Sequence, residues 1–148
     1  LVYSFIVYGE PQGKGRPRMT RSGHAYTPEK TRSYESLVAE SWRMCLGASY
    51  EPMTGPVNVA IIAMYTIPKS KSKKFRAAAE RGLIRPTKKP DADNIMKAIC
   101  DALNGLAWID DSQIVNATVE KRWTASLPMV QVLIDDWDGE CEPEPESE

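Results

Sequence analysis

Apolar residues alternate with polar ones, or run together, in four stretches of the chain that predict β-strands. These stretches are rich in β-branched and aromatic residues and cover residues 1–8, 57–67, 113–122 and 129–136. A turn at residues 125–128 joins the last two stretches, so we expect them to pair as an antiparallel hairpin.

Three other stretches repeat apolar residues at the spacing of a helix. The first follows the N-cap signal Thr27-Pro28 and ends at Gly47, and a short one covers residues 75–80. The third begins with Asp93 as its N-cap residue. The face predicted to be apolar consists of Tyr34, Leu37, Val38, Ser41 and Cys45 in the first helix and of Ile95, Ile99, Ala102, Leu103 and Leu106 in the third.

The order of the longer elements, β-α-β-α-β-β, predicts an α+β fold, a two-layer sandwich in which helices pack on one face of a mixed sheet. The chain has 148 residues, and we assign residues 1–137 to a single domain. No apolar run approaches the roughly 18–20 residues of a membrane span. The first residues also lack a signal-peptide pattern, so we expect a cytoplasmic protein with no membrane partner.

Positive charge is concentrated in two segments, although the net charge is only −1. Residues 9–32 and 69–89 hold 15 of the 19 Lys and Arg residues but three of the 20 acidic ones, which predicts a polyanionic partner. Within the first segment, residues 11–23 are expected to form a mobile loop. Residues 138–148 hold six acids and no base and predict a disordered tail. The side chains expected to contact the phosphates of this partner, as DNA-binding residues if it is DNA, are Lys14, Arg16, Arg18, Arg21, Lys71, Lys73, Lys74, Arg76, Lys88 and Lys89.

Four aspartates and one lysine lie in two short segments. Asp91 and Asp93 stand at the start of the third helix, and Lys97 follows one helical turn after Asp93. Asp110 and Asp111 come where we expect the chain to return past that helix start. Clustered carboxylates repel unless a cation compensates them, and hard oxygen donors suit Mg²⁺, with Mn²⁺ as a substitute. This chemistry suits phosphodiester hydrolysis, in which the metal activates water and the lysine offsets developing charge.

Each of these residues also has a structural interpretation. An aspartate before a helix is a common cap, and Lys97 has the (i, i+4) spacing of a solvated ion pair with Asp93 or Asp101. We interpret Asp101 as structural. If the other aspartates are also structural, the alternative function is a non-catalytic DNA-binding module. Trp108 and Trp123 are expected in the core or in an interface rather than stacked on bases.

Three motifs of the chain resemble the signature of RusA-type Holliday junction resolvases. They are PDADNIMK at residues 90–97, DALNG at residues 101–105 and DDSQI at residues 110–114. The run GKGRPR at residues 13–18, after the first strand, is also similar to the family. The resemblance covers most of the chain and leaves only the acidic tail outside.

The resemblance implies a bacterial or prophage homodimer that resolves four-way DNA junctions by paired, symmetric, Mg²⁺-dependent nicks in DNA recombination and repair. The family's two motif aspartates match Asp91 and Asp93, and its lysine matches Lys97. Its third aspartate matches the Asp110-Asp111 pair, of which we favour Asp111. We therefore expect Asp91, Asp93, Lys97 and Asp111 to be catalytic, and Asp91, Asp93, Asp111 and Asp110 to hold the metal.

Overall fold

The structure is a computed structural model that describes residues 2–15, 17–26, 28–47 and 49–137. Its strands are β1 (Val2–Tyr8), β2 (Arg18–Met19), β3 (Ala25–Tyr26), β4 (Val57–Thr66), β5 (Ile114–Thr124) and β6 (Met129–Asp136). Its helices are α1 (Glu29–Leu46), α2 (Lys73–Glu80), α3 (Ala92–Leu103) and the 3₁₀ turn η1 (Asp111–Gln113). The predicted acidic tail, residues 138–148, lies outside the described residues.

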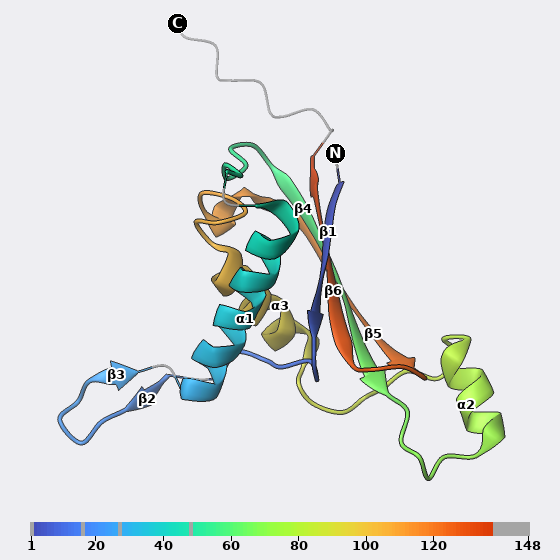
Figure 1. Cartoon of the computed structure of the whole chain (residues 1–148). Coiled ribbons are helices and arrows are strands. Elements are labelled where there is room, and N and C mark those ends of the chain that lie inside the picture. Colours follow the sequence, from blue (N-terminus) through green and yellow to red (C-terminus); the bar gives the residue numbers. More distant parts are fainter. Residues whose placement is uncertain (1, 16, 27, 48, 138–148) are drawn as a thin grey trace, which may run out of the picture.

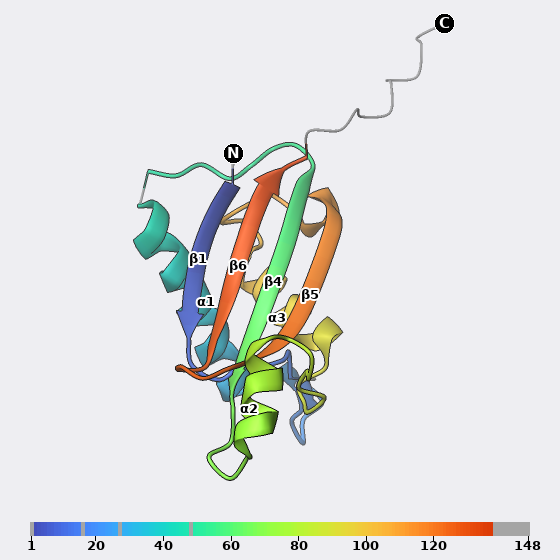
Figure 2. The same cartoon turned by 90° about the vertical axis from the view of Figure 1, so that its right-hand side faces the viewer.

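The four long strands form one sheet in the order β1-β6-β4-β5. β6 pairs antiparallel with both β1 and β4, whereas β5 pairs parallel with β4. Helices α1 and α3 lie together against one face of this mixed sheet (Figure 1). The predicted α+β class is therefore confirmed. One detail differs, because α2 lies on the opposite side, near the ends of β4 and β5 (Figure 2).

The predicted hairpin between the last two strands is wrong. β4 lies between β5 and β6, and the connection from β5 crosses the end of β4. There the Ile67 N–H donates to the Thr124 carbonyl at 3.0 Å, and the Thr66 hydroxyl donates to the Ser126 carbonyl at 3.0 Å. A short turn shows that the chain reverses, but it does not select the neighbouring strand. β4 is mostly apolar and β-branched, as expected of an interior strand.

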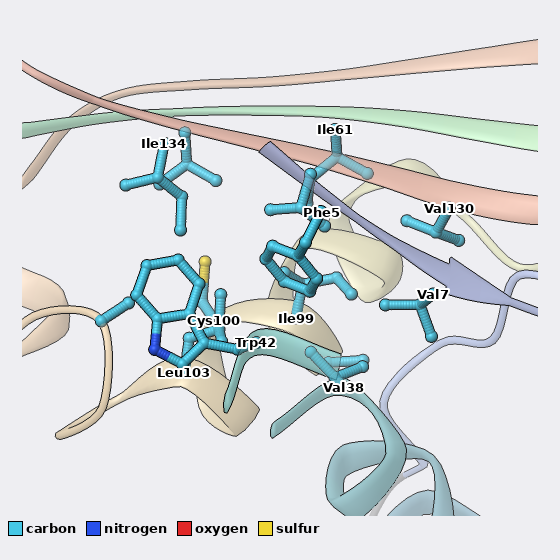
Figure 3. Close-up of a cluster of buried hydrophobic side chains, with 14 of the residues drawn as sticks. Phe5, Val7, Val38, Trp42, Ile61, Ile99, Cys100, Leu103, Val130 and Ile134 are labelled. Atoms are coloured by element: carbon cyan, nitrogen blue, oxygen red, sulfur yellow. The ribbon is translucent and has the colours of Figure 1, made fainter. Parts of the chain in front are cut away.

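The core lies between the sheet and helices α1 and α3, and Figure 3 shows its central side chains. α3 buries Ile95, Ile99 and Leu103, as predicted. The buried face of α1 differs from the prediction, since Leu37 is 45% exposed and Trp42 is buried. The alternating residues of β4 and β6 that complete the core are Val57, Val59, Ile61, Ala63, Val130, Val132 and Ile134.

Two predicted boundaries shift at the N-terminal part of the domain. The stretch 11–23, expected to be a loop throughout, contains β2, which pairs with β3 in an antiparallel ribbon. α1 begins at Glu29 with Pro28 at its N-cap position, whereas Thr27, the predicted cap, lies outside the described residues. Across the described ranges, no helix is both long and apolar enough to cross a bilayer.

Candidate active site

A groove of about 800 Å³ lies between the N-terminal loop, the start of α1 and the segment before α3. We call it the Asp91 groove, because Asp91 is on its wall. Tyr65 of β4 contributes to its lining, and burial raises the pKa of this phenol to about 12. The residues that line the groove are Glu10 to Gly15, Pro17, Arg18, Pro28, Lys30, Thr31, Tyr65, Lys88 to Asp91 and Asn94. Its cations outnumber its acids, so the groove suits a phosphate backbone.

Asp91 occupies the N-cap position of α3, and the predicted N-cap residue Asp93 lies in the first turn instead. Both side chains are exposed. The Asp91 carboxylate makes no capping hydrogen bond to the helix. An aspartate at this position usually does so, because its oxygen satisfies a free backbone N–H. Asp91 therefore stands at the N-cap position, but its side chain does not cap the helix. Its carboxylate remains available to a ligand.

Asp110 and Asp111 have different environments. Asp110 caps η1, where its carboxylate accepts from the Ser112 N–H at 3.0 Å, and hydrogen bonding to the side chain and the N–H of Ser112 lowers the pKa of Asp110. The carboxylate of Asp111 accepts from the indole N–H of buried Trp108 at 2.7 Å. Asp110 thus has a local structural role, while Asp111 is held in place from the core. This difference supports Asp111 as the functional member of the pair.

Lys97 lies in the second turn of α3. Its side chain is 62% exposed, and its ammonium is 3.7 Å from the Asp101 carboxylate. Burial raises the pKa of the Cys100 thiol to about 12, with Asp111 and Asp101 adding to the shift and Lys97 opposing it. The same turn of α3 is therefore close to Asp111 and to Lys97. Along the axis of α3, Cys100 lies seven residues and about 10 Å beyond Asp93, so the part of α3 near Asp111 is about two turns from the helix start.

The described residues contain no group of three acidic, His or Cys side chains placed to hold a metal. Asp91 and Asp93 both lie at the start of α3, whereas Asp111 lies in η1. Mg²⁺ does not need a complete protein cage, because one or two carboxylates, waters and substrate phosphates usually supply its ligands. By the type of donor, the exposed carboxylates of Asp91 and Asp93 fit such an ion.

The N-terminal loop is fixed directly onto the segment that carries Asp91. The Lys14 N–H donates to the Asn94 carbonyl at 3.0 Å, and the Gly15 N–H donates to the Thr31 hydroxyl at 3.0 Å. The Lys14 ammonium donates to Glu35 and lies 3.1 Å from Asp101. Burial alone would lower the pKa of Lys14, but these two carboxylates outweigh it and raise the pKa. The side chain of Lys14 is thus engaged within the protein, and its contact with DNA stays a prediction.

Gly13→Ala is expected to lower the free energy of unfolding by about 1–3 kcal/mol, as overpacking does. A Cβ at Gly13 would lie 2.9 Å from the Cβ atoms of both Asn94 and Pro90 and would push the loop off the Asp91 segment. Urea denaturation measures the change. Gly55→Ala is the matched control, since a Cβ there meets nothing within 4 Å. If the two variants unfold with equal free energies, the close packing at Gly13 does not stabilise the site.

Sequence reasoning missed Lys121 of β5. Its ammonium donates to the carbonyl of Lys88 and, at 3.1 Å, to that of Pro90. The Lys88 ammonium in turn lies 5.0 Å from the centre of the Tyr65 ring. Lys121 therefore positions the segment before Asp91 from the neighbouring strand. No spacing along the chain could indicate this, because the contact depends on the parallel pairing of β4 and β5.

The predicted DNA-binding residues fall into separate regions. Arg18, Lys88 and Lys89 line the Asp91 groove, together with Lys30, which was not among the predicted set. Arg21 lies in the turn of the β2–β3 ribbon, and Arg16 lies outside the described residues. Lys14 also lines the groove, and the remaining four belong to α2 and the turn before it, on the opposite side of the sheet: Lys71, Lys73, Lys74 and Arg76.

A cationic groove with an exposed carboxylate on its wall suits a protein that binds a nucleic-acid backbone and acts on its phosphodiester bonds. The family model described as Endodeoxyribonuclease RusA matches residues 8–135. The chain belongs to this family, which confirms the resemblance of its motifs. It is also 41% identical over 138 residues to the uncharacterized protein YqaN of Bacillus subtilis (strain 168), covering 88% of this chain and 93% of that protein.

Membership in the family makes the chain an endodeoxyribonuclease by class, that is, a hydrolase of phosphodiester bonds within DNA. The family also implies Holliday junction resolvase activity, with branched DNA as the substrate.

The two tryptophans were expected in the core or in an interface. Trp108 is fully buried, and Trp123 is half-buried with its ring 6.3 Å from that of Tyr65.

Proposed function

We propose that the protein resolves four-way DNA junctions by paired, symmetric, Mg²⁺-dependent nicks in DNA recombination and repair. The observation that carries this proposal is the position of Asp91, which lies on the wall of a cationic groove at the start of α3. A DNA strand in the groove would bring its phosphates beside the carboxylates, and the groove cations would offset their charge. Family membership supports the substrate class.

The residues have distinct roles in this proposal. Asp91 and Asp93 hold the metal, and Asp111 contributes a carboxylate kept in orientation by Trp108. A bound Mg²⁺, or Mn²⁺ in its place, supplies an activated water and stabilises the leaving oxygen. Lys97 offsets the negative charge that grows on the phosphate as the bond breaks. Lys121 and the loop at Gly13 keep the Asp91 segment in position while the strand is bound.

We propose that the active form is a homodimer. A four-way junction has approximate two-fold symmetry, so a two-fold dimer places one site at each of two equivalent phosphates. A single subunit has one start of α3 and would make a single nick. We also propose a bacterial setting, including prophages, which the similarity to a protein of Bacillus subtilis supports.

The proposal is tested by incubating the protein with a synthetic four-way junction and with a linear duplex of matching sequence. We expect paired symmetric nicks in the junction with Mg²⁺, no nicks with chelator, and an intact duplex. A protein that binds the junction and leaves it uncut under all conditions would instead be the non-catalytic DNA-binding module. Nicks in a single strand would contradict the dimer and retain the nuclease.

A further inference from the structure

The β2–β3 ribbon is an exposed arm. Residues 17–26 are all exposed, and Figure 1 shows the ribbon extending away from α1 and from the sheet. Its hydrogen bonds close it on itself, since the Thr20 N–H donates to the His24 carbonyl at 2.8 Å and the Gly23 N–H donates to the Thr20 carbonyl at 3.0 Å. A two-stranded ribbon alone in water is marginally stable at best, so a partner is expected to complete it.

The charge of the arm selects the partner. Between Glu10 and Glu29 the sequence has no acidic residue, and the ribbon itself carries Arg18 and Arg21. Arg18 also lines the Asp91 groove, so the groove continues onto the ribbon. A polyanion that lies in the groove would therefore meet the ribbon next. These features favour DNA over a second copy of the chain. The chain has 19 basic and 20 acidic residues, so a second copy lacks the strong negative charge that would attract the ribbon.

The two faces of the ribbon differ in chemistry. Arg18 pairs with Tyr26, and Met19 pairs with Ala25, so each pair shares a face. Met19 is 67% exposed and Tyr26 is 46% exposed. The major groove of DNA admits a two-stranded β-ribbon, where apolar side chains can contact bases while arginines contact phosphates. The ribbon thus has the shape and the side chains for such a groove.

We propose that the β2–β3 ribbon is a DNA-binding arm that enters the major groove of the duplex leaving the Asp91 groove. Arg18, Arg21 and the Tyr26 hydroxyl contact phosphates, and Met19, on the other face of the ribbon from Arg18 and Tyr26, lies against the bases. This inference rests on the proposed function, because it takes branched DNA as the ligand. It adds a second contact region, separate from the carboxylates, that holds the duplex arm during cleavage.

The test measures binding in chelator of a synthetic four-way junction to the full chain over a range of salt concentrations. Replacing both arginines, as Arg18→Ala with Arg21→Ala, is expected to weaken binding about ten- to a hundredfold and to reduce the slope of log affinity against log salt by about two. Met19→Ala with Tyr26→Ala is expected to weaken binding about tenfold with an unchanged slope. Because these side chains are exposed, the variants should keep the fold, which circular dichroism checks.

Matched controls come from the far end of α1, where Met44 is 81% exposed and Arg43 lies in the last helical turn. Met44→Ala and Arg43→Ala are expected to bind within about twofold of the unchanged protein. Ribbon variants that bind as tightly as these controls overturn the proposal. So do ribbon variants that turn a dimer into monomers in sedimentation, because the arm would then serve a second copy.

The outcomes separate this inference from the proposed function. If the unchanged protein cuts the junction and the ribbon variants bind it normally, the ribbon proposal fails and the nuclease stands. If the unchanged protein never cuts but the ribbon variants lose affinity, the nuclease proposal fails and the DNA-binding arm stands.

Discussion

Asp91→Asn is expected to lower the rate of junction cleavage at least about a thousandfold, the scale of loss when one catalytic carboxylate is removed. Binding of the junction should persist or improve, since the change removes a negative charge from a cationic groove. Stability should be unchanged, because the Asp91 side chain makes no capping hydrogen bond and Asn is an equally good cap residue. Single-turnover cleavage, binding in chelator and urea denaturation measure the three effects.

The control for this variant is Asp136→Asn. Asp136 is also exposed, but it pairs with Val57 at the beginning of β4, whereas Tyr65 of the groove lies near the end of that strand. Cleavage by the control should match that of the unchanged protein. A pattern in which Asp91→Asn cuts normally but unfolds more easily would make the aspartate a helix cap and would remove it from the catalytic site.

Lys97→Ala is expected to lower the cleavage rate about a hundred- to a thousandfold, the loss found when one transition-state donor is removed. Affinity for the junction should change little, because Lys97 does not line the Asp91 groove, which has several cations of its own. Among the residues that the structure describes, its ammonium pairs with Asp101 alone, and Asp101 also pairs with Lys14, so the ammonium is free to move towards a phosphate. The measurement is the single-turnover rate at saturating protein, with affinity determined separately.

Lys97→Arg and Arg43→Ala accompany this variant. Arg keeps the charge and should recover part of the lost rate, whereas Arg43→Ala removes a cation from the last turn of α1 and should cut normally. If Lys97→Ala weakens binding and leaves the saturated rate unchanged, the lysine belongs to the DNA-binding surface and has no role in the chemical step.

Most of the secondary structure could be predicted because the spacing of apolar residues differs between strands and helices. β4 is a mostly apolar run of ten residues whose alternate side chains are buried, and α3 places Ile95, Ile99 and Leu103 on one buried face. Strand order could not be predicted in the same way, since pairing depends on which edges remain free after the chain has folded. The apolar character of β4 was the available signal, because an interior strand is paired on both sides.

In the candidate site, too, local spacing predicted some residues, and others could be found only from the folded structure. Asp91, Asp93 and Lys97 stand within seven residues of one another, so local spacing was enough to single them out as candidates. Their catalytic roles stay predictions until the variants are measured. The indole of Trp108 that fixes Asp111 is only three residues away, but its role depends on Trp108 being buried in the core, and the ammonium of Lys121 that holds the Pro90 carbonyl comes from a distant segment. The spacing of residues could show neither the burial of Trp108 nor the position of Lys121, because both depend on how the sheet and α3 pack together.

The position of β6 has a consequence for synthesis of the chain on the ribosome. β6 fills the place between β1 and β4, yet it is the last strand to be translated. Until residues 129–136 have left the exit tunnel, β1 has no neighbour in the sheet and β4 lacks its antiparallel one. A domain generally folds as a unit, and β6 contributes Val130, Val132 and Ile134 to the core. A nascent chain that stops before β6 therefore cannot complete the core between the sheet and α3. A cell would therefore acquire this DNA-cutting activity only from chains translated through β6.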